Sequence, residues 1–320
     1  MVEAQTVDHE SAFPARERTT PAPDARLRQP SLLDIPAQPS AWSRLARTGK
    51  AQVGAGLLLI LVLASLAAPL ITPHQPDIQN VREKLAPPAL QAGGSWSHPL
   101  GTDQLGRDVL SRILYGARTS LAIGLFATVT AAAIGIVLGI IAGYYGRSLD
   151  AVIMRVVDVQ MAFPSILLAL AIMVMLGPGL RNLVLVLAIT SWEFFARLVR
   201  AEALSLRHRD FVEGGRAIGA TDGRLIRHYI VPSLVGTISV VATLTVARTV
   251  IAESSLSFLG LGIQPPTPSW GGMLAEGRRY LAVAWWIATF PGLVLMMTVV
   301  GINLLGDALR DVLDPQLGNN

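Results

Sequence analysis

The residues best suited to chemistry in this chain lie in one stretch, 211–232, which reads FVEGGRAIGATDGRLIRHYIVP. The chain as a whole is 52% hydrophobic and only 15% charged, whereas soluble domains carry about 25% charged residues. A charged, glycine-punctuated stretch could be a solvated loop, or it could be approached closely by another protein. Its charged residues are Glu213, Arg216, Asp222, Arg224 and Arg227.

Catalysis finds little support in the rest of the sequence. A phosphate-binding loop needs Gly-x-x-x-x-Gly-Lys-Ser/Thr, and neither of the two lysines, Lys50 and Lys84, stands in such a loop. The five histidines show no spacing typical of a catalytic metal site, and neither a cysteine nor a Gly-x-Ser-x-Gly elbow occurs. We therefore expect no catalytic residue, no cofactor and no metal ligand, and we predict that the chain is not an enzyme.

The first half of the stretch has the pattern of a short helix. Asp210 is a candidate N-cap, and Glu213, three residues on, can complete a capping box. Gly219 suits the position just past the helix end, where a left-handed backbone penalises a Cβ. Gly214 and Gly215 each cost about 1 kcal/mol relative to alanine inside a helix, which favours close approach of another backbone.

The second half predicts another helix that leads into an apolar run. Thr221 or Asp222 can cap it, and Pro232 is tolerated in the first turn of the apolar helix that follows. Its apolar face is formed by Leu225, Ile226, Tyr229 and Ile230.

The elements that must position this stretch are membrane spans. A bilayer core of about 30 Å takes about 20 apolar helical residues, because every backbone group must be satisfied internally. Six stretches qualify, which predicts an all-α membrane protein. The expected spans are 51–71, 119–143, 151–176, 183–201, 233–254 and 283–306.

Lysine and arginine predict the orientation, because they concentrate on the cytoplasmic side. With a cytoplasmic N-terminus, 17 of them fall in inside segments and 8 in outside segments. We therefore expect both termini, and the stretch 211–232, in the cytoplasm. Residues 1–40 hold six prolines and no apolar run, which indicates a disordered cytoplasmic tail rather than a secretory signal. The membrane domain is then 41–320.

A stripe of small residues marks the second span. Small side chains let helices approach closely in lipid, where hydrophobicity does not drive association. The pattern favours packing against a neighbouring span over a contact between two copies of the chain. The stripe consists of Ala127, Ala131, Gly135, Gly139 and Gly143.

Charged residues inside the spans are costly unless they are paired. Glu193 and Arg197 are four residues apart with the acid first, the favoured order for a helical ion pair. Arg155 and Asp158 are three apart near the end of the third span. We interpret both as structural pairs.

Arg248 has no such neighbour in the fifth span. Glu253 stands five residues on, which is less suited to a contact on one helix face. Arg248 either pairs with an acid on another helix or subunit, or it lines a pathway through the membrane, where it could bind the carboxylate of a peptide. Arg248 and Glu253 are therefore the candidate pathway residues.

The stretch also resembles a known signature. It reads Glu-Gly-Gly, three residues, Gly219, nine residues, then Tyr-Ile-Val-Pro232. The "EAA" signature of bacterial ABC importer permeases is Glu-Ala-Ala, three residues, Gly, nine residues, Ile-x-Leu-Pro. Both alanines are glycine here, and Tyr229 and Val231 replace Ile and Leu. The resemblance implies a coupling helix over 210–228 that docks in a groove of an ATPase subunit. The residues it assigns to this coupling are Glu213, Gly214, Gly215, Arg216, Gly219, Ala220, Asp222 and Pro232.

Three longer stretches narrow the resemblance to one branch. HPLGTDQLGRDVLSRILYGARTSL (98–121), ESSLSFLGLGIQPPTPSWG (253–271) and GDALRDVLDPQL (306–317) resemble the C-type subunits of the dipeptide/oligopeptide/nickel permeases. The resemblance implies a MetI-like type I ABC importer fold with six transmembrane helices, in a bacterial inner membrane. The proline-rich run 265–271 favours peptide over nickel as substrate; a nickel or other small-solute importer, or an ATPase-independent secondary transporter, is the alternative.

The same resemblance implies partners. They are a homologous permease subunit, two ABC ATPase subunits that bind ATP and magnesium, and an extracytoplasmic substrate-binding protein; no nucleic acid is expected.

Two segments are predicted outside the membrane. In 98–121, Thr102 or Asp103 could cap an amphipathic helix on the outer membrane surface, with Arg107 and Asp108 on its polar face. The segment 253–282 is interrupted by Gly-Leu-Gly and Pro-Pro and is expected to be a stiff external loop. Such a loop could receive the binding protein or simply pack on the ends of the spans.

Overall fold

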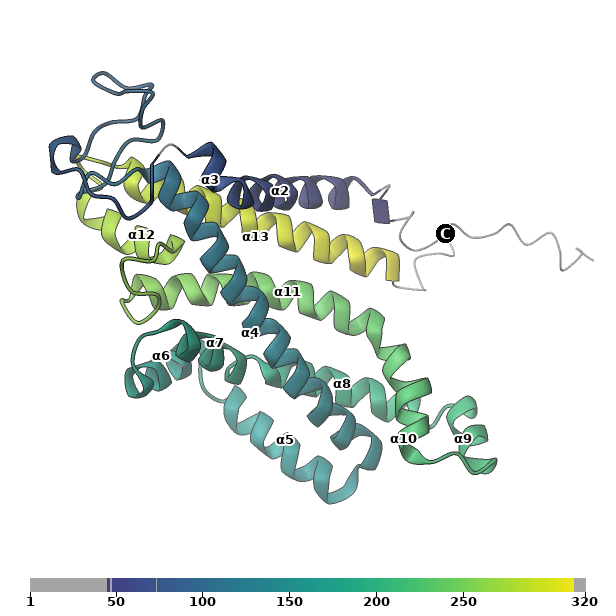
Figure 1. Ribbon diagram of the computed structural model, residues 1–320. Helices are drawn as coiled ribbons and strands as arrows, with labels where there is room; N and C mark the ends of the chain where they lie inside the picture. The colour runs from purple at the N-terminus through teal and green to yellow at the C-terminus, as the bar shows by residue number, and fades with distance from the viewer. Residues whose placement is uncertain (1–44, 47, 73, 314–320) are drawn as a thin grey trace, which may run out of the picture. The chain divides into compact units, whose positions relative to one another are not determined.

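The computed structural model describes residues 45–313, with the exception of residues 47 and 73, and the regular secondary structure of these residues is helical (Figure 1). The expected tail over 1–40 lies outside the described residues. The long helices are α2 (Gly49–Leu66), α4 (Val109–Tyr145), α11 (Val231–Phe258) and α13 (Trp286–Leu313). The shorter ones are α3 (Ala68–Ile71), α5 (Arg147–Met161), α6 (Ser165–Leu176), α7 (Leu180–Ile189), α8 (Trp192–Leu206), α9 (Asp210–Ala217), α10 (Asp222–Leu225) and α12 (Trp270–Gly277), with one-turn elements η1 (Val81–Glu83), η2 (Ile226–Ile230) and η3 (Arg278–Tyr280).

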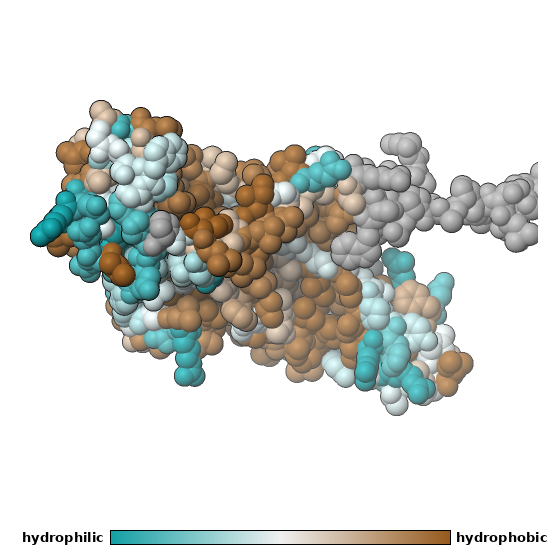
Figure 2. Space-filling view, turned by 45° about the horizontal axis from the view of Figure 1, so that its top comes forward, coloured by the Kyte–Doolittle hydropathy of each residue, from teal (hydrophilic) through white to brown (hydrophobic). Residues whose placement is uncertain are grey.

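Five helical stretches among the described residues are long and apolar enough to cross a membrane, and a sixth crossing would be a bent helix pair. The five are Gly49–Leu66, Val109–Tyr145, Leu180–Leu206, Asp222–Phe258 and Trp286–Leu313. Figure 2 shows apolar residues over the middle of these helices and polar residues gathered toward their ends, as lipid on the flanks and water at the ends require.

The third expected span differs from a straight helix. It is the pair α5 and α6, which meet at 90°. Pro164 stands directly before α6; it has no N–H to donate, and it biases the residue before it, Phe163, away from the helical region. The chain therefore breaks between Met161 and Ser165 and changes direction there.

The small-residue stripe of α4 packs on α8. A Cβ added at Gly135 would lie 2.4 Å from the carbonyl oxygen of Trp192, and one at Gly139 would lie 2.7 Å from that of Ala196. At Gly143 the corresponding distance, to the carbonyl oxygen of Arg200, is 2.6 Å. Only glycine permits so close an approach, so the expectation of packing within the chain is confirmed.

The two expected ion pairs along single helices are wrong. Arg197 of α8 binds Asp158 of α5, and Arg200 of α8 binds Asp150, also of α5. Glu193 instead accepts a hydrogen bond of 2.6 Å from Gln160 Nε2. Because α5 and α8 pack together, Glu193, Arg197 and Arg200 of α8 each bind a side chain of α5.

The start of the second span also differs from the expected amphipathic surface helix. Residues 98–108 form turns, and α4 begins only at Val109, with Asp108 as its N-cap. Arg107 and Asp108 are buried rather than exposed on a polar face. Within 253–282, residues to Phe258 belong to α11 and Trp270–Gly277 form α12, so only part of that segment is loop.

Candidate functional site

The charged stretch 211–232 folds as α9, a turn at Gly219, and α10, at the end of the helices opposite to α12 (Figure 1). Gly219 has φ +85°, the left-handed conformation that the sequence predicts. Its N–H bonds the carbonyl of Arg216, and the N–H of Ala220 bonds that of Gly215, both at 3.0 Å. These two bonds form a Schellman motif, which ends α9 and fixes the direction of the chain toward α10.

The expected capping box is absent. Arg209 is the N-cap of α9 and no side chain caps it. Asp210 and Glu213 instead lie in the first helical turn, where negative charge is favoured by the helix dipole. Thr221 is the N-cap of α10, again without a side-chain bond.

One face of α9 is anchored and the other is open. Val212 is fully buried, and Gly215 is covered by Leu225, whose Cδ2 would lie 2.8 Å from an added Cβ. Nothing lies within 4 Å of a Cβ built at Gly214 or Gly219. Next to this bare face, Ile218 is 86% exposed. The bare backbone at Gly214 and Gly219 leaves room for another surface to approach α9 closely.

Tyr144, at the end of α4, holds both halves of the stretch. Its hydroxyl donates to Asp222 Oδ1 at 2.6 Å and accepts from Arg216 Nη2 at 3.3 Å. The guanidinium of Arg216 also lies 5.9 Å from the centre of the tyrosine ring. Sequence reasoning missed Tyr144, because nothing in the spacing relates residue 144 to residues 216 and 222.

The stretch continues without interruption into a membrane helix. Asp222–Phe258 counts as one helical run of 37 residues through α10, the π-helical turn η2 and α11, with Pro232 in the first turn of α11. A helix rises about 1.5 Å per residue, so Thr245 lies about 35 Å along it from Asp222.

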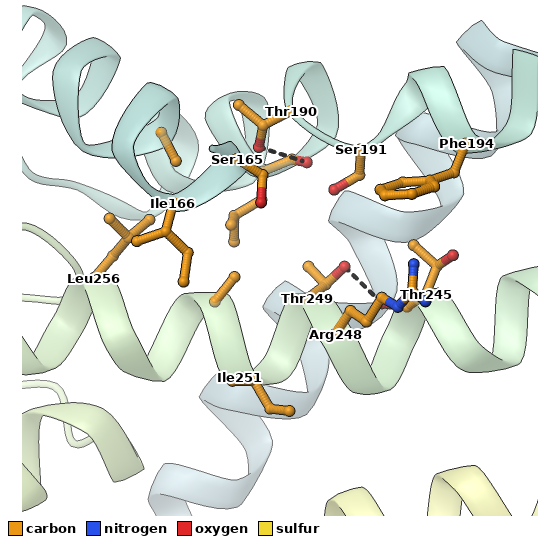
Figure 3. A pocket seen from close by; sticks show the side chains of 13 residues that line it. Ser165, Ile166, Thr190, Ser191, Phe194, Thr245, Arg248, Thr249, Ile251 and Leu256 are labelled. Carbon is orange, nitrogen blue, oxygen red and sulfur yellow. Dashed lines mark hydrogen bonds between the residues drawn. The ribbon is translucent and has the colours of Figure 1, made fainter. Parts of the chain in front are cut away.

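A cavity of about 340 Å³ opens on that part of α11 (Figure 3). Arg248 lines it together with polar side chains from α6, from the turn between α7 and α8, and from α11. The guanidinium of Arg248 lies 5.0 Å from the centre of the Phe194 ring. Arg248 forms no ion pair with any described acid. The hydroxyl groups that line the cavity with it belong to Ser165, Thr190, Ser191, Thr245 and Thr249.

Glu253 lies away from this cavity. Its side chain is fully buried and accepts hydrogen bonds from Ser257 Oγ at 2.8 Å and Ser254 Oγ at 3.2 Å. Of the two candidate pathway residues, the structure brings only Arg248 to the cavity wall.

A buried ionic network lies at the opposite end from α9. Asp103 binds Arg107 Nε at 2.6 Å and Arg112 Nη1 at 2.5 Å, and Glu276 of α12 binds both arginines at 2.7 Å. Burial raises the pKa of Glu276, but the hydrogen bonds and charges of Arg112 and Arg107, with a bond from Gln104, outweigh it and hold the pKa below its usual 4.5. The network joins the 98–108 turns to α12, a structural role.

Two parts of the sequence match models of known protein families. Residues 135–319 match the binding-protein-dependent transport system inner membrane component, and residues 40–88 match the N-terminal TM domain of oligopeptide transport permease C.

Curated relatives cover nearly the whole chain. A di/tripeptide transport system permease protein of Pseudomonas aeruginosa is 42% identical over 93% of this chain and 97% of its own length. A dipeptide transport system permease protein of Alkalihalophilus pseudofirmus is 40% identical over 95% of this chain and 98% of its own length. A glutathione transport system permease protein of Escherichia coli is 44% identical over 86% of this chain and 89% of its own length.

Among solved structures, an inward-facing form of the MetNI methionine ABC transporter matches with a TM-score of 0.52 and 21% identity, over 62% of this chain and 95% of that one. This match confirms the MetI-like fold. The family matches and the relatives are all membrane permease components, which are not catalytic. The chain belongs to the family of binding-protein-dependent transport system inner membrane components, the permease subunits of ABC importers.

Proposed function

We propose that this chain is the permease subunit of an ATP-driven importer of short peptides, and that residues 210–228 are its contact with an ATPase. The observation that carries the coupling role is the anchored, one-sided architecture of α9. Its inner face is packed on Leu225, while Ile218, Gly214 and Gly219 are open. A helix with one bare, partly apolar face fits the groove of a partner protein.

The contacts of α9 and α10 connect the stretch 211–232 both to α4 and to α11. The Tyr144 hydroxyl joins Arg216 and Asp222 to the end of α4, and α10 runs into α11. Because α4 packs on α8 and α11 lines the cavity, a movement of α9 shifts helices on several sides of the cavity. ATP drives transport only if it favours one of the two arrangements over the other.

The basic-residue bias supports both termini and residues 210–228 in the cytoplasm. The ATPases would then meet α9 inside the cell, while a substrate-binding protein would meet the end that carries α12. A second, homologous permease chain would complete the pathway, with ATP and magnesium bound by the ATPases.

The relatives' names supply the substrate class, since they refer to dipeptide, di/tripeptide and glutathione transport. The cavity is compatible with a peptide. Its hydroxyl groups can bind backbone groups, and Arg248, without an acidic partner among the described residues, can bind a C-terminal carboxylate.

Substitutions at the turn test the coupling. Gly219→Val forces a β-branched residue into the left-handed region, at a cost of about 1–2 kcal/mol, and tilts α9 relative to α10. Gly219→Asn is the matched control, because asparagine tolerates this conformation. In proteoliposomes with all partner subunits, we expect Gly219→Val to retain ATPase activity but to lose most peptide uptake per ATP, and Gly219→Asn to stay near wild type.

Glu213→Ala provides a second measurement, because it removes an exposed charge without altering the turn. We expect weaker cross-linking of position 218 to the ATPase and a lower uptake-to-ATPase ratio. Normal uptake by both Gly219→Val and Glu213→Ala, or uptake by the chain without any ATPase, would overturn the proposal. Assays with dipeptides, longer peptides and Ni²⁺ define the substrate.

A further inference from the structure

A histidine cluster outside the Arg248 cavity and the stretch 211–232 lies where the segment after α3 meets the start of α4. One possible ligand atom from each of His74, His98 and Asp108 lies within 4.8 Å of the others. The rings of His74 and His98 are 4.4 Å apart between centroids. A cavity of about 290 Å³ borders the cluster, and Glu83 also lines it.

The hydrogen bonds of His98 do not balance for a neutral ring. Nδ1 lies 2.9 Å from Asp108 Oδ1, and Nε2 lies 3.2 Å from Glu83 Oε2. A neutral imidazole has one N–H, and a carboxylate only accepts. The two contacts are therefore satisfied either by an imidazolium, which has an N–H on both nitrogens, or by a cation that lies between a neutral ring and a carboxylate.

His74 supplies a second, independent observation. Its Nδ1 atom is buried and has no hydrogen-bond partner. A buried polar atom without a partner costs about 1–3 kcal/mol, so such atoms are rare unless something else binds them. Two imidazoles and two carboxylates are also a ligand set that binds Zn²⁺ and related ions.

We propose that His74, His98 and Asp108, with Glu83 beside them, bind a divalent transition-metal cation. The cation accepts the lone pair of His74 Nδ1 and neutralises the two carboxylates. Asp108 is already held in place, because its Oδ2 accepts from the backbone N–H and the hydroxyl of Ser111, both at 2.7 Å. Such outer contacts orient a metal ligand before the metal binds.

Binding requires a small contraction of the cluster. Ligand atoms around one tetrahedral Zn²⁺ lie about 3.3 Å apart, given Zn–N distances of about 2.0–2.1 Å. His74 is partly buried and Glu83 is exposed, so both side chains can rotate. The cation would fasten residues 74–83 to the N-cap of α4. This site shares no residue with the cavity that Arg248 lines, so it is structural and separate from the substrate.

Zinc titration of the full-length chain tests the proposal. The chain is purified in detergent with a tag that contains no histidine, stripped with EDTA, and titrated with Zn²⁺ against a chromogenic chelator. We expect one Zn²⁺ per chain and a higher melting temperature with Zn²⁺ than with Mg²⁺. Both His74→Ala and Glu83→Gln should weaken Zn²⁺ binding by tenfold or more.

The matched control is His208→Ala, because His208 is exposed and lies near α9, at the other end of the helices. It should leave stoichiometry and affinity unchanged. Absence of stoichiometric Zn²⁺ binding, or unchanged affinity in both His74→Ala and Glu83→Gln, would overturn the proposal. Equal stabilisation by Mg²⁺ would also overturn it, because imidazole ligands select transition metals.

Discussion

Arg248 is a guanidinium in a cavity wall that has an aromatic ring but no acid as its neighbour. An unpaired charge at membrane depth is costly, and a substrate carboxylate would relieve that cost. The neighbouring hydroxyls of Thr245 and Thr249 donate to the backbone of their own helix at 2.7 and 2.8 Å. Arg248 is the one cationic side chain among the described residues that line the cavity.

We predict that Arg248→Gln raises the KM for peptide uptake roughly ten- to a hundredfold, because a hydrogen bond to a charged group is worth about 1.5–3 kcal/mol. Peptides with an amidated C-terminus serve as the control. Wild type should discriminate against them, and Arg248→Gln should not. Equal loss for free-acid and amidated peptides would exclude a carboxylate contact, and uptake kinetics in proteoliposomes measure both.

Tyr144 is a positioning residue at the same scale. Tyr144→Phe keeps the ring beside Arg216 but removes the hydroxyl that joins Arg216 to Asp222. We predict more ATP hydrolysed per peptide imported, with expression unchanged. Tyr145→Phe, on the adjacent exposed residue, is the control. The ratio of the two rates distinguishes this role from a structural one, which would lower both rates together.

At the scale of elements, the contact between α4 and α8 depends on small residues. A Cβ at Gly139 would lie 2.7 Å from the carbonyl oxygen of Ala196 and 2.8 Å from Val199 Cβ, whereas one at Gly56 of α2 would meet nothing within 4 Å. Alanine substitutions at these two glycines therefore distinguish the effect of helix propensity from the effect of packing between α4 and α8.

We predict that Gly139→Ala lowers the free energy of unfolding by about 1–3 kcal/mol, the usual cost of overpacking. Gly56→Ala should be neutral or slightly stabilising, because alanine favours helix. Thermal unfolding of the purified variants in detergent measures the difference. Equal stability of the two variants would show that α4 and α8 separate readily.

The break between α5 and α6 is a further feature at this scale. Its position can be predicted from Phe163 and Pro164, since proline ends the hydrogen-bond ladder. The 90° angle cannot be predicted locally, because it also involves the packing of α5 against α8, which the Asp158–Arg197 and Asp150–Arg200 pairs join.

At the scale of the whole molecule, the buried network of Asp103, Arg107, Arg112 and Glu276 joins segments that are far apart in sequence. The pKa of Glu276 is lowered in the folded state. The charged carboxylate therefore stabilises the fold above its unfolded pKa of 4.5, and this stabilisation is lost as the pH falls through the lower, folded pKa.

We predict that Glu276→Gln destabilises the protein by about 3 kcal/mol at pH 7, because it removes a negative charge that compensates two buried arginines. The difference from wild type should stay constant down to about pH 4.5 and shrink at lower pH. Asp311→Asn, which breaks an exposed pair with Lys50, should cost under about 1 kcal/mol. A difference that grows on acidification would contradict the lowered pKa.

The sequence by itself determined the class of protein and the approximate positions of its membrane spans, because hydropathy and length act locally. It also determined the left-handed Gly219, since backbone sterics belong to a single residue, and the small-residue face of α4, since helical periodicity places those residues together.

Only the tertiary structure decided which side chains meet. Arg197 binds Asp158 rather than Glu193, Tyr144 bonds Asp222, and His74 lies against His98. Each of these contacts joins segments that hydropathy and local spacing do not relate. Their partners depend on how helices and turns pack, and a one-dimensional pattern contains the period of a helix but not its neighbour.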